Sequence, residues 1–374
     1  MRAVPSAAIA IFQTFLCVAH WFLYLTWVDF WWPMSPGPLM VLRVAMLLLS
    51  IVFIPATLLS FRFSNPAVRL LYRAAAVWMG LANFLFLGAW LAWLTDLVLR
   101  FTVPAASRLA DRPYVAAVLL ASAIATSAFG LINARVLRVR NVSVSLGKLP
   151  ETWRGRRAML ISDTHLGHVN GAEFAKRVAA KAKELDPGII FIAGDLFDGS
   201  KVDAAEMVAP LREMKARLGV FFVSGNHEEY GGAAMFEEAV RGVGIRVLQN
   251  QCVTVDGMRI VGVPYGPASH QLHVRAFLEE LDLKTGPASI LLHHVPTGLP
   301  IAEHAGVSLQ LSGHTHGGGQ IIPFNFITRR AFGEFTYGLR RFGDMQVYTS
   351  SGAGTWGPPM RVGTNAEIVL LTFA

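Results

Sequence analysis

Side chains of the types that bind metal ions follow short apolar runs in the second half of the chain. They are aspartates, histidines and one asparagine, with no cysteine among them. A mixed set of carboxylate, amide and imidazole ligands suits Mn, Fe, Zn or a similar ion rather than an iron–sulfur cluster or a structural cysteine–zinc site. Seven ligands are too many for one tetrahedral ion and suit two ions, about 3.5–4 Å apart, that share one carboxylate. The candidates are Asp163, His165, Asp195, Asn226, one of His293 and His294, His314 and His316.

The segments that must position these residues alternate between strand and helix patterns. Each polar cluster follows an apolar run, and amphipathic helical patterns separate the first three runs. The runs lie at 158–162, 189–194, 220–225, 289–292 and 308–313, and the helical patterns at 172–185, 203–217 and 233–240. Fully apolar strands that alternate with helices predict a largely parallel sheet covered on both faces. Ligands gather at the carboxyl ends of such strands, where all five polar clusters fall.

Glycine directly precedes three of the candidate ligands. Gly194, Gly225 and Gly313 stand before Asp195, Asn226 and His314. We expect each glycine to allow a sharp turn after its strand, so that the next side chain points at the metal.

Five motifs occur in the order found in a known family. They are Asp163-x-His165, Gly194-Asp195-x-x-Asp198, Gly225-Asn226-His227-Glu228, His294-x-Pro296 and Gly313-His314-x-His316. Over residues 141–374 the chain resembles the calcineurin-like metallophosphoesterases, in particular their membrane-attached prokaryotic subgroup. The resemblance implies an α/β domain of two packed, mixed sheets flanked by helices, and the hydrolysis of a phosphoester with two divalent or transition metal ions.

The resemblance also implies a role for each motif residue. The first metal would be held by Asp163, His165 and His316, and Asp195 would bridge to the second. Asn226, His294 and His314 would complete the second metal. His227 would lie over the substrate phosphate as a general acid or transition-state donor. The His-x-Pro pattern favours His294 over His293, because neighbours in a strand point to opposite faces.

Other polar residues leave alternatives open. Asp198 and Glu228 either orient the ligands beside them or lie at the surface. His168, His270, His273 and His304 have no partner pattern, and we expect them in exposed loops. Arg329 and Arg330 follow the last motif by one loop. They are candidates for clamping the substrate phosphate or contacting anionic lipid, and the alternative is simple solvation.

The first half of the chain has the composition of a membrane protein. Hydrophobic residues make up 53% of the sequence and charged ones 16%, yet residues 1–134 hold only 8 of the 33 basic and 3 of the 25 acidic residues. Four apolar stretches lie at 7–27, 39–60, 74–97 and 114–132. Each has about the 20 residues that a helix needs to cross the hydrocarbon core of a membrane. We therefore predict a bundle of about four transmembrane helices over 1–134 and a metallophosphoesterase domain over 135–374.

Arginine bias predicts how the chain lies in the membrane. With the N-terminus inside, seven arginines fall on the cytoplasmic side and four on the outer side. This excess favours a multi-pass protein of the cell (inner) membrane with a cytoplasmic catalytic domain. Arg100, Arg108 and Arg112, which lie together on the outer side, argue the other way.

These observations predict a membrane-anchored, dinuclear phosphoesterase or pyrophosphatase with the lipid bilayer as partner. Four spans favour a substrate that is lipid-linked or lies at the membrane surface, and related proteins suggest a nucleotide-sugar lipid such as a UDP-diacylglucosamine. The alternative is a membrane sensor or scaffold whose phosphoesterase-like domain binds metal without turnover. The net charge of +8 raises nucleic acid as a partner, but we expect none, because no aromatic–basic platform or groove-binding motif appears.

Overall fold

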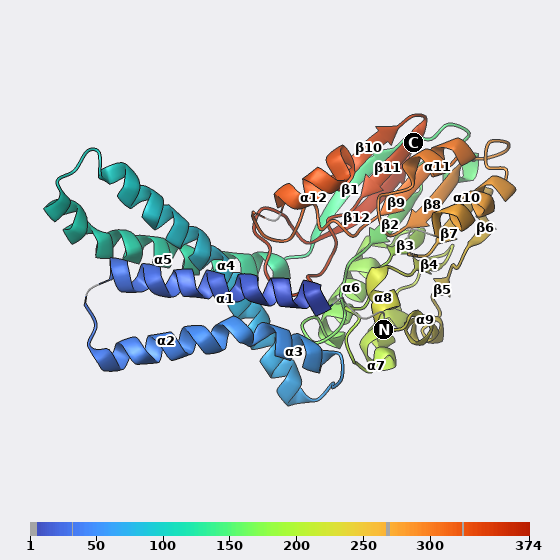
Figure 1. Cartoon of the computed structure of the whole chain (residues 1–374). Coiled ribbons are helices and arrows are strands. Elements are labelled where there is room, and N and C mark those ends of the chain that lie inside the picture. The colour runs from blue at the N-terminus through green and yellow to red at the C-terminus, as the bar shows by residue number, and fades with distance from the viewer. Residues whose placement is uncertain (1–5, 32, 267–269, 324) are drawn as a thin grey trace. The chain divides into compact units, whose positions relative to one another are not determined.

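The computed structural model describes residues 6–31, 33–266, 270–323 and 325–374 (Figure 1). The chain divides into two compact units. One comprises Arg2–Ile132 with Gly357–Met360, and the other comprises Asn133–Trp356 with Arg361–Ala374.

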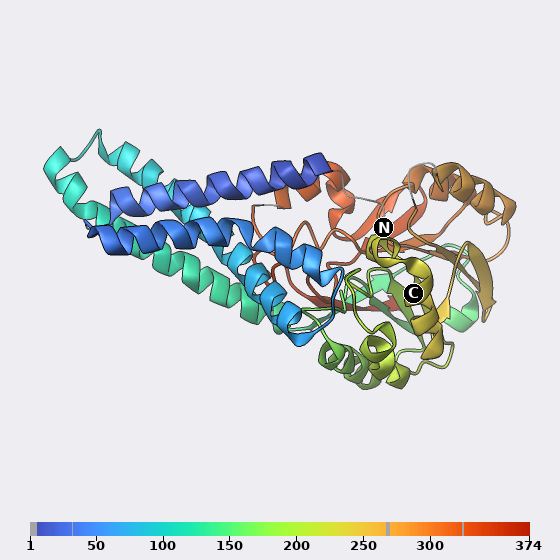
Figure 2. The same cartoon turned by 60° about the horizontal axis from the view of Figure 1, so that its bottom comes forward.

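The first unit is made of long apolar helices. They are α1 (Ser6–Phe30), α2 (Pro36–Ile51), α3 (Phe53–Ser60), α4 (Pro66–Leu99) and α5 (Ala105–Arg135). Helix α1 runs beside α2 and α4 (Figure 2). In the described part of the chain four helical spans are long and apolar enough to cross a membrane, with α2 and α3 together forming one of them. This confirms the four predicted apolar spans.

Helix α5 begins nine residues before the predicted apolar stretch at 114–132. Its first turns carry Arg108 and Arg112, which both bind the buried carboxylate of Asp96 near the end of α4. Arg112 Nη1 also lies 2.9 Å from Asp29 Oδ2. These ion pairs let polar residues extend the helix beyond its apolar part, and the apolar pattern alone does not reveal that extension.

The second unit is a two-layer sandwich. Its described residues form two six-stranded sheets, in the orders β1-β12-β2-β3-β4-β5 and β10-β11-β9-β8-β7-β6. The first sheet consists of β1 (Arg138–Val144), β2 (Arg157–Ile161), β3 (Ile189–Ala193), β4 (Val220–Val223), β5 (Arg246–Val247) and β12 (Glu367–Phe373). The second consists of β6 (Gln251–Val255), β7 (Met258–Val263), β8 (Ser289–His293), β9 (Leu309–Ser312), β10 (Gly338–Phe342) and β11 (Met345–Thr349).

Both sheets are mixed. Strands β2 to β5 are parallel to one another and β12 is antiparallel to β2, while β7, β8, β9 and β11 are parallel and the outer strands β6 and β10 run antiparallel to their neighbours. This confirms the two mixed sheets implied by the family resemblance. The strand–helix pattern predicted largely parallel strands, and it did not reveal that they divide between two sheets: the first three apolar runs lie in one sheet and the last two in the other.

The apolar strands pack on both faces. Leu160 and Phe191 of the first sheet meet Leu292 and Leu311 of the second in the core between the layers. The outer face of the first sheet packs against α6 (Ala172–Leu185), α7 (Ala204–Val208) and α9 (Ala233–Gly242). The outer face of the second sheet packs against α10 (His270–Glu280) and α11 (Leu299–Ala305). Two further short helices are α8 (Asn226–Gly231) and α12 (Asn325–Phe332), and short 3-10 turns lie at Glu151–Trp153, Ala209–Glu213 and Gly333–Thr336.

Candidate metal centre

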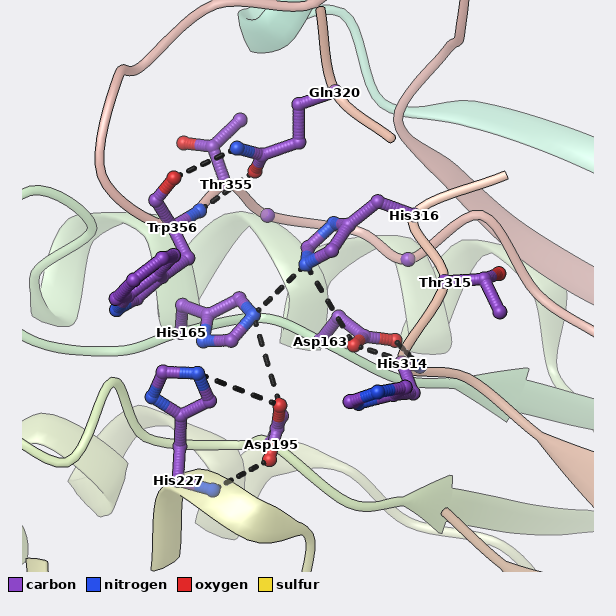
Figure 3. Close-up of polar contacts among 12 residues, drawn as sticks. Asp163, His165, Asp195, His227, His314, Thr315, His316, Gln320, Thr355 and Trp356 are labelled. Carbon is purple, nitrogen blue, oxygen red and sulfur yellow. Dashed lines mark hydrogen bonds and ion pairs between the residues drawn. The ribbon is translucent and has the colours of Figure 1, made fainter. Parts of the chain in front are cut away.

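The structure brings all the predicted ligands to one edge of the sandwich, beyond the carboxyl ends of five strands. Asp163 and His165 follow β2, Asp195 follows β3, and Asn226 begins α8 just after β4. His294 follows β8, and His314 and His316 follow β9. Figure 3 shows His165 and His227, which follow different strands, pointing at Asp195, with Asp163, His314 and His316 close by. Parallel strands end at the same edge, so residues far apart in the sequence meet there.

Among the described residues there are three groups in which all ligand atoms lie within 4.8 Å of one another. They are Asp163 with His165 and His316, Asp195 with His294 and His314, and Asp195 with His165 and His227. Nε2 of His294 lies 3.1 Å from Oδ2 of Asp195, and Nε2 of His165 lies 3.9 Å from the same oxygen. The Asp195 carboxylate therefore faces both of the predicted metal positions.

Two further contacts join other predicted ligands to one another. Nε2 of His165 and Nε2 of His316 face each other at 3.1 Å. Nδ1 of His314 lies 2.9 Å from the amide oxygen of Asn226. These groups offer imidazole nitrogens and oxygens and include no thiolate, which is a donor set suited to Mn, Fe or Zn.

His293 and His294 point in different directions, as expected for neighbours at a strand end. The His294 side chain is fully buried, and its Nδ1 donates to the backbone oxygen of Ala193 (2.7 Å), so Nε2 is the nitrogen that faces Asp195. His293 instead donates from Nδ1 to the backbone oxygen of Val263 (3.1 Å) and lines a cavity beside the centre.

Most of the predicted ligands have an unusual backbone conformation. Asp163, His165, Asp195, His314 and His316 all have φ between 48° and 70°. This left-handed region is uncommon for residues other than glycine, and such strain clusters at functional sites, where surrounding structure holds it in place. Here the hydrogen bonds of the loops fix it, for example from the backbone N–H of Asp163 to the oxygen of Gly194 (3.1 Å).

The three glycines serve the centre in two ways. Gly194 has φ of 84°, as the predicted sharp turn requires. Gly225 has φ of −98°, which any residue can adopt, but a Cβ there would stand 2.2 Å from Oδ1 of Asp195. A Cβ at Gly313 would likewise stand 2.3 Å from Oδ2 of Asp163. For Gly225 and Gly313 the requirement is therefore space for the carboxylates.

Buried charges around the centre shift the pKa values of its members. Burial, followed by neighbouring histidine charges, lowers the pKa of His314 to about 4 and lowers those of His165 and His316 well below the usual value. Burial opposes protonation of His294 too, but the Asp195 carboxylate outweighs it and raises that pKa to about 10. Burial raises the pKa of Asp163 to about 6. Three of the predicted histidine ligands are therefore neutral, which is the form that coordinates metals.

Two carboxylates beside the ligands are buried and tie the loops together. Glu228 accepts hydrogen bonds from the backbone N–H groups of Asp195 (3.0 Å), Phe197 (2.8 Å) and Gly225 (2.6 Å). Burial, together with the Asp195 charge, raises the pKa of Glu228 to about 8. Asp198 accepts from the backbone N–H groups of Ser200 (2.8 Å) and His168 (3.2 Å). Of the two alternatives for these carboxylates, orientation of the site loops is the one the structure supports.

His227 lies at the edge of the centre. Its Nδ1 donates to the backbone oxygen of Asp198 (2.9 Å), so Nε2 faces the cluster, 3.9 Å from Oδ2 of Asp195. The ring packs edge-on against His165 and lies 5.2 Å from the half-exposed ring of Trp356. Trp356 is in turn held by backbone hydrogen bonds to the side chain of Gln320 (Figure 3).

Sequence reasoning missed Arg361. This fully buried side chain donates to the backbone oxygens of Ser351 (2.7 Å), Gly352 (3.0 Å) and Gly354 (2.7 Å) and to Nδ1 of His316 (3.3 Å). Arg361 therefore holds the ring of His316 through the Nδ1 nitrogen, which is the one that does not face His165. No sequence motif includes Arg361.

The other histidines and arginines lie outside the metal-binding groups. His168 is fully buried, so its predicted exposure is wrong: the 163–170 loop folds back on itself, with the Gly167 N–H bound to the Asn170 oxygen (2.7 Å). His273 and His304 are exposed, though on helices, and the side chain of His270 lies outside the described residues. Arg329 and Arg330 are exposed on α12, the helix whose Phe332 ring lies 5.8 Å from the ring of His314.

These features define a two-sheet α/β domain with a candidate dinuclear metal centre at the strand ends. A family model described as calcineurin-like phosphoesterase matches residues 156–318. An uncharacterized metallophosphoesterase of Aquifex aeolicus is 32% identical over 260 residues, which cover 67% of this chain and 97% of that protein. The chain belongs to the calcineurin-like metallophosphoesterases.

Two further relatives extend the comparison. A transmembrane protein with a metallophosphoesterase domain from Danio rerio is 32% identical over 275 residues, 69% of this chain and 62% of that protein. An uncharacterized metallophosphoesterase of Campylobacter jejuni is 32% identical over 244 residues, 62% of each chain. The matched region thus spans somewhat less than two thirds of these two relatives.

Proposed function

We propose that this protein is a membrane-anchored, two-metal phosphoesterase whose substrate is lipid-linked or lies at the membrane surface. The observation that carries the proposal is the position of Asp195, whose Oδ2 lies 3.1 Å from Nε2 of His294 and 3.9 Å from Nε2 of His165, one histidine from each proposed set of ligands. A carboxylate shared between two sets of ligands is the arrangement that two-metal hydrolases use.

Asp163, His165 and His316 would hold one ion, and Asn226, His294 and His314 the other, with Asp195 between them. The described side chains fit such ions, because their donors are all oxygen or nitrogen and the imidazoles of His165, His314 and His316 are neutral. When bound, the two ions supply a hydroxide at neutral pH and bind the phosphoryl oxygens.

His227 would act on the substrate rather than on the metals. The backbone oxygen of Asp198 accepts a hydrogen bond from the Nδ1–H of His227, so the imidazole presents Nε2 to the centre in a fixed orientation. A protonated Nε2 there can donate to the departing oxygen of a phosphoester. Burial of the ring between His165 and Trp356 limits the access of water to it.

Helix α12 supports a substrate at the membrane surface. Phe326 and Ile327 are 74% and 65% exposed, and Arg329 and Arg330 follow them on the same helix. Apolar side chains beside arginines are typical of segments that bind anionic lipid interfaces. Because Phe332 of this helix packs near His314, lipid bound at α12 would lie next to the metal centre. The four apolar spans and the arginine bias favour an inner-membrane protein with this domain in the cytoplasm.

The test uses the full chain in lipid nanodiscs with added Mn²⁺. We expect release of 4-nitrophenol from 4-nitrophenyl phosphate, and faster turnover of lipid-linked pyrophosphates, including a UDP-diacylglucosamine, than of their water-soluble counterparts. An Asp163→Asn variant serves as the control for contaminating phosphatases. Bound metal without hydrolysis of any phosphoester would favour the sensor or scaffold alternative.

A further inference from the structure

A cavity of about 260 Å³ borders the candidate metal centre on the outer side of the second sheet. Apolar side chains from β7, β8, α10 and α11 form one part of its wall, among them Val263, Leu291, Leu278 and Ala302. His314 lines the cavity as well. It thus begins at a predicted ligand of the second metal and extends away from it, beneath α10 and α11.

One polar group in the lining of this cavity is the amide of Gln310. The side chain is fully buried on β9, where its sequence neighbours Leu309 and Leu311 point into the core between the sheets. Its Nε2 donates to the backbone oxygen of Val295 (3.4 Å) and to Oγ of Ser312 (3.1 Å). Its Oε1 has no hydrogen-bond partner within the described part of the chain. Buried acceptors are normally satisfied, so an open acceptor in a cavity wall indicates a ligand that donates to it.

The lining also limits the charge and size of the ligand. None of the described residues that line the cavity is an aspartate, glutamate, lysine or arginine. A phosphate or another ionised group would be desolvated there with no carboxylate, ammonium or guanidinium group beside it, and the polar side chains among the described lining residues are hydroxyl, amide and imidazole groups. The volume lies just below the usual range of small-molecule pockets, about 300–1,000 Å³, and so suits one substituent rather than a whole ligand.

We propose that this cavity binds an uncharged, apolar substituent of the phosphoester substrate that carries a hydrogen-bond donor for Gln310. The inference rests on the proposed function, since it needs the phosphate to lie at the metal centre. His227, the predicted donor to the departing oxygen, lies on the other side of Asp195 from His314 (Figure 3). The substituent in the cavity is therefore the one that stays on phosphorus, and the substrate class is a diester or pyrophosphate rather than a simple monoester.

A homologous series of alkyl 4-nitrophenyl phosphodiesters, from methyl to octyl, tests the proposal. The full chain in nanodiscs with Mn²⁺ should show kcat/KM rising by up to about fourfold for each methylene until the cavity is full, and then levelling. Ala302→Phe places a ring in the cavity and should flatten this rise. His304→Phe adds the same ring to an exposed position of α11 and should keep the wild-type slope, because it leaves the cavity unfilled. Partitioning of the longer substrates into lipid affects both variants equally, so a difference between their slopes reports on the cavity.

The role of Gln310 has its own comparison. An ω-hydroxyalkyl diester of the optimal length should be preferred over the plain alkyl diester by the wild type, and Gln310→Leu should reverse the preference. This comparison decides the matter if Ala302→Phe does not fold. Hydrolysis of the whole series with no dependence on length or hydroxyl group would overturn the cavity assignment and leave the proposed function standing. No hydrolysis of any member by a metal-loaded protein that still hydrolyses 4-nitrophenyl phosphate would overturn the cavity assignment alone. Failure on the diesters, on 4-nitrophenyl phosphate and on the lipid-linked pyrophosphates together would overturn the proposed function itself.

Discussion

Asp195 is the residue on which the two predicted metal positions depend together. Its Oδ2 lies 3.1 Å from His294 on one side and 3.9 Å from His165 on the other. Asp195→Asn keeps the shape of the side chain and removes its charge. We expect both ions to be lost together, with metal affinity falling by more than the roughly 10–100-fold typical of outer partners of a metal site. Metal content per chain, measured after purification without chelator, is the readout.

The matched control for this prediction is Asn226→Ala, which removes a predicted ligand of the second ion only. It should leave close to one metal per chain. An Asp195→Asn protein that retained two metals and full activity would contradict the bridging assignment.

His227 can be separated from the metal ligands by the leaving group of the substrate. If Nε2 protonates the departing oxygen, its contribution should be greatest where that oxygen is a poor leaving group. We expect His227→Gln to lose about 10²–10⁴-fold in rate on alkyl phosphoesters and much less on 4-nitrophenyl esters, whose phenolate needs no proton. Metal content should be unchanged.

Two outcomes would point to other roles for His227. Equal losses on both classes of ester would indicate phosphate binding or stabilisation of transition-state charge. Loss of metal would make His227 a ligand, as its place in the third group of ligand atoms allows.

At this scale the sequence predicts which residues gather but not how the chain holds them. Residue type, spacing and position after apolar runs were sufficient for Asp163, Asp195 and His314. The left-handed backbone at these positions is imposed by hydrogen bonds between loops that are distant in sequence. The role of Arg361 could not be predicted from the sequence for the same reason, because its partners are backbone oxygens that only the fold brings together.

Helix α12 has an exposed surface of apolar side chains and arginines that suits contact with lipid. Large apolar side chains stabilise membrane contact by about 1.5–3 kcal/mol each when fully buried. We therefore expect the double variant Phe326→Ser and Ile327→Ser to lower turnover of a lipid-linked phosphoester in anionic vesicles by about tenfold or more. Turnover of 4-nitrophenyl phosphate should not change, because the helix contributes no metal ligand.

Leu272→Ser offers a matched control for the α12 variant. Leu272 is 75% exposed, on α10, and replacing it removes an exposed apolar side chain from another helix of the same domain. An equal loss in both variants, or a loss on the soluble ester, would contradict a specific role for α12.

Helices and strands could be predicted where the spacing of apolar residues follows one clear periodicity. Helix α6 spans 172–185, as its pattern predicted. The helix predicted at 203–217 stops at Val208 and continues as a 3-10 turn over Ala209–Glu213. Pro210 explains the difference, since proline lacks an N–H and clashes with the preceding helical turn. The division of the strands between two sheets was implied only by the family resemblance, because both sheets use the same apolar strand pattern.

For the whole molecule the decisive question is which side of the membrane carries the domain of residues 135–374. The seven arginines assigned inside outnumber the four outside, which predicts that this domain lies in the cytoplasm. Three of the four outer arginines, Arg100, Arg108 and Arg112, surround the buried Asp96, so they also have a structural reason to be there. Their clustering is then weaker evidence for a reversed orientation than their number suggests. We expect a reporter that is active only in the cytoplasm to be active when fused after Ala374, and the domain to resist protease added to intact cells. Removal of the domain by that protease would show the reversed orientation, and would place both the metal centre and its substrate on the outer face.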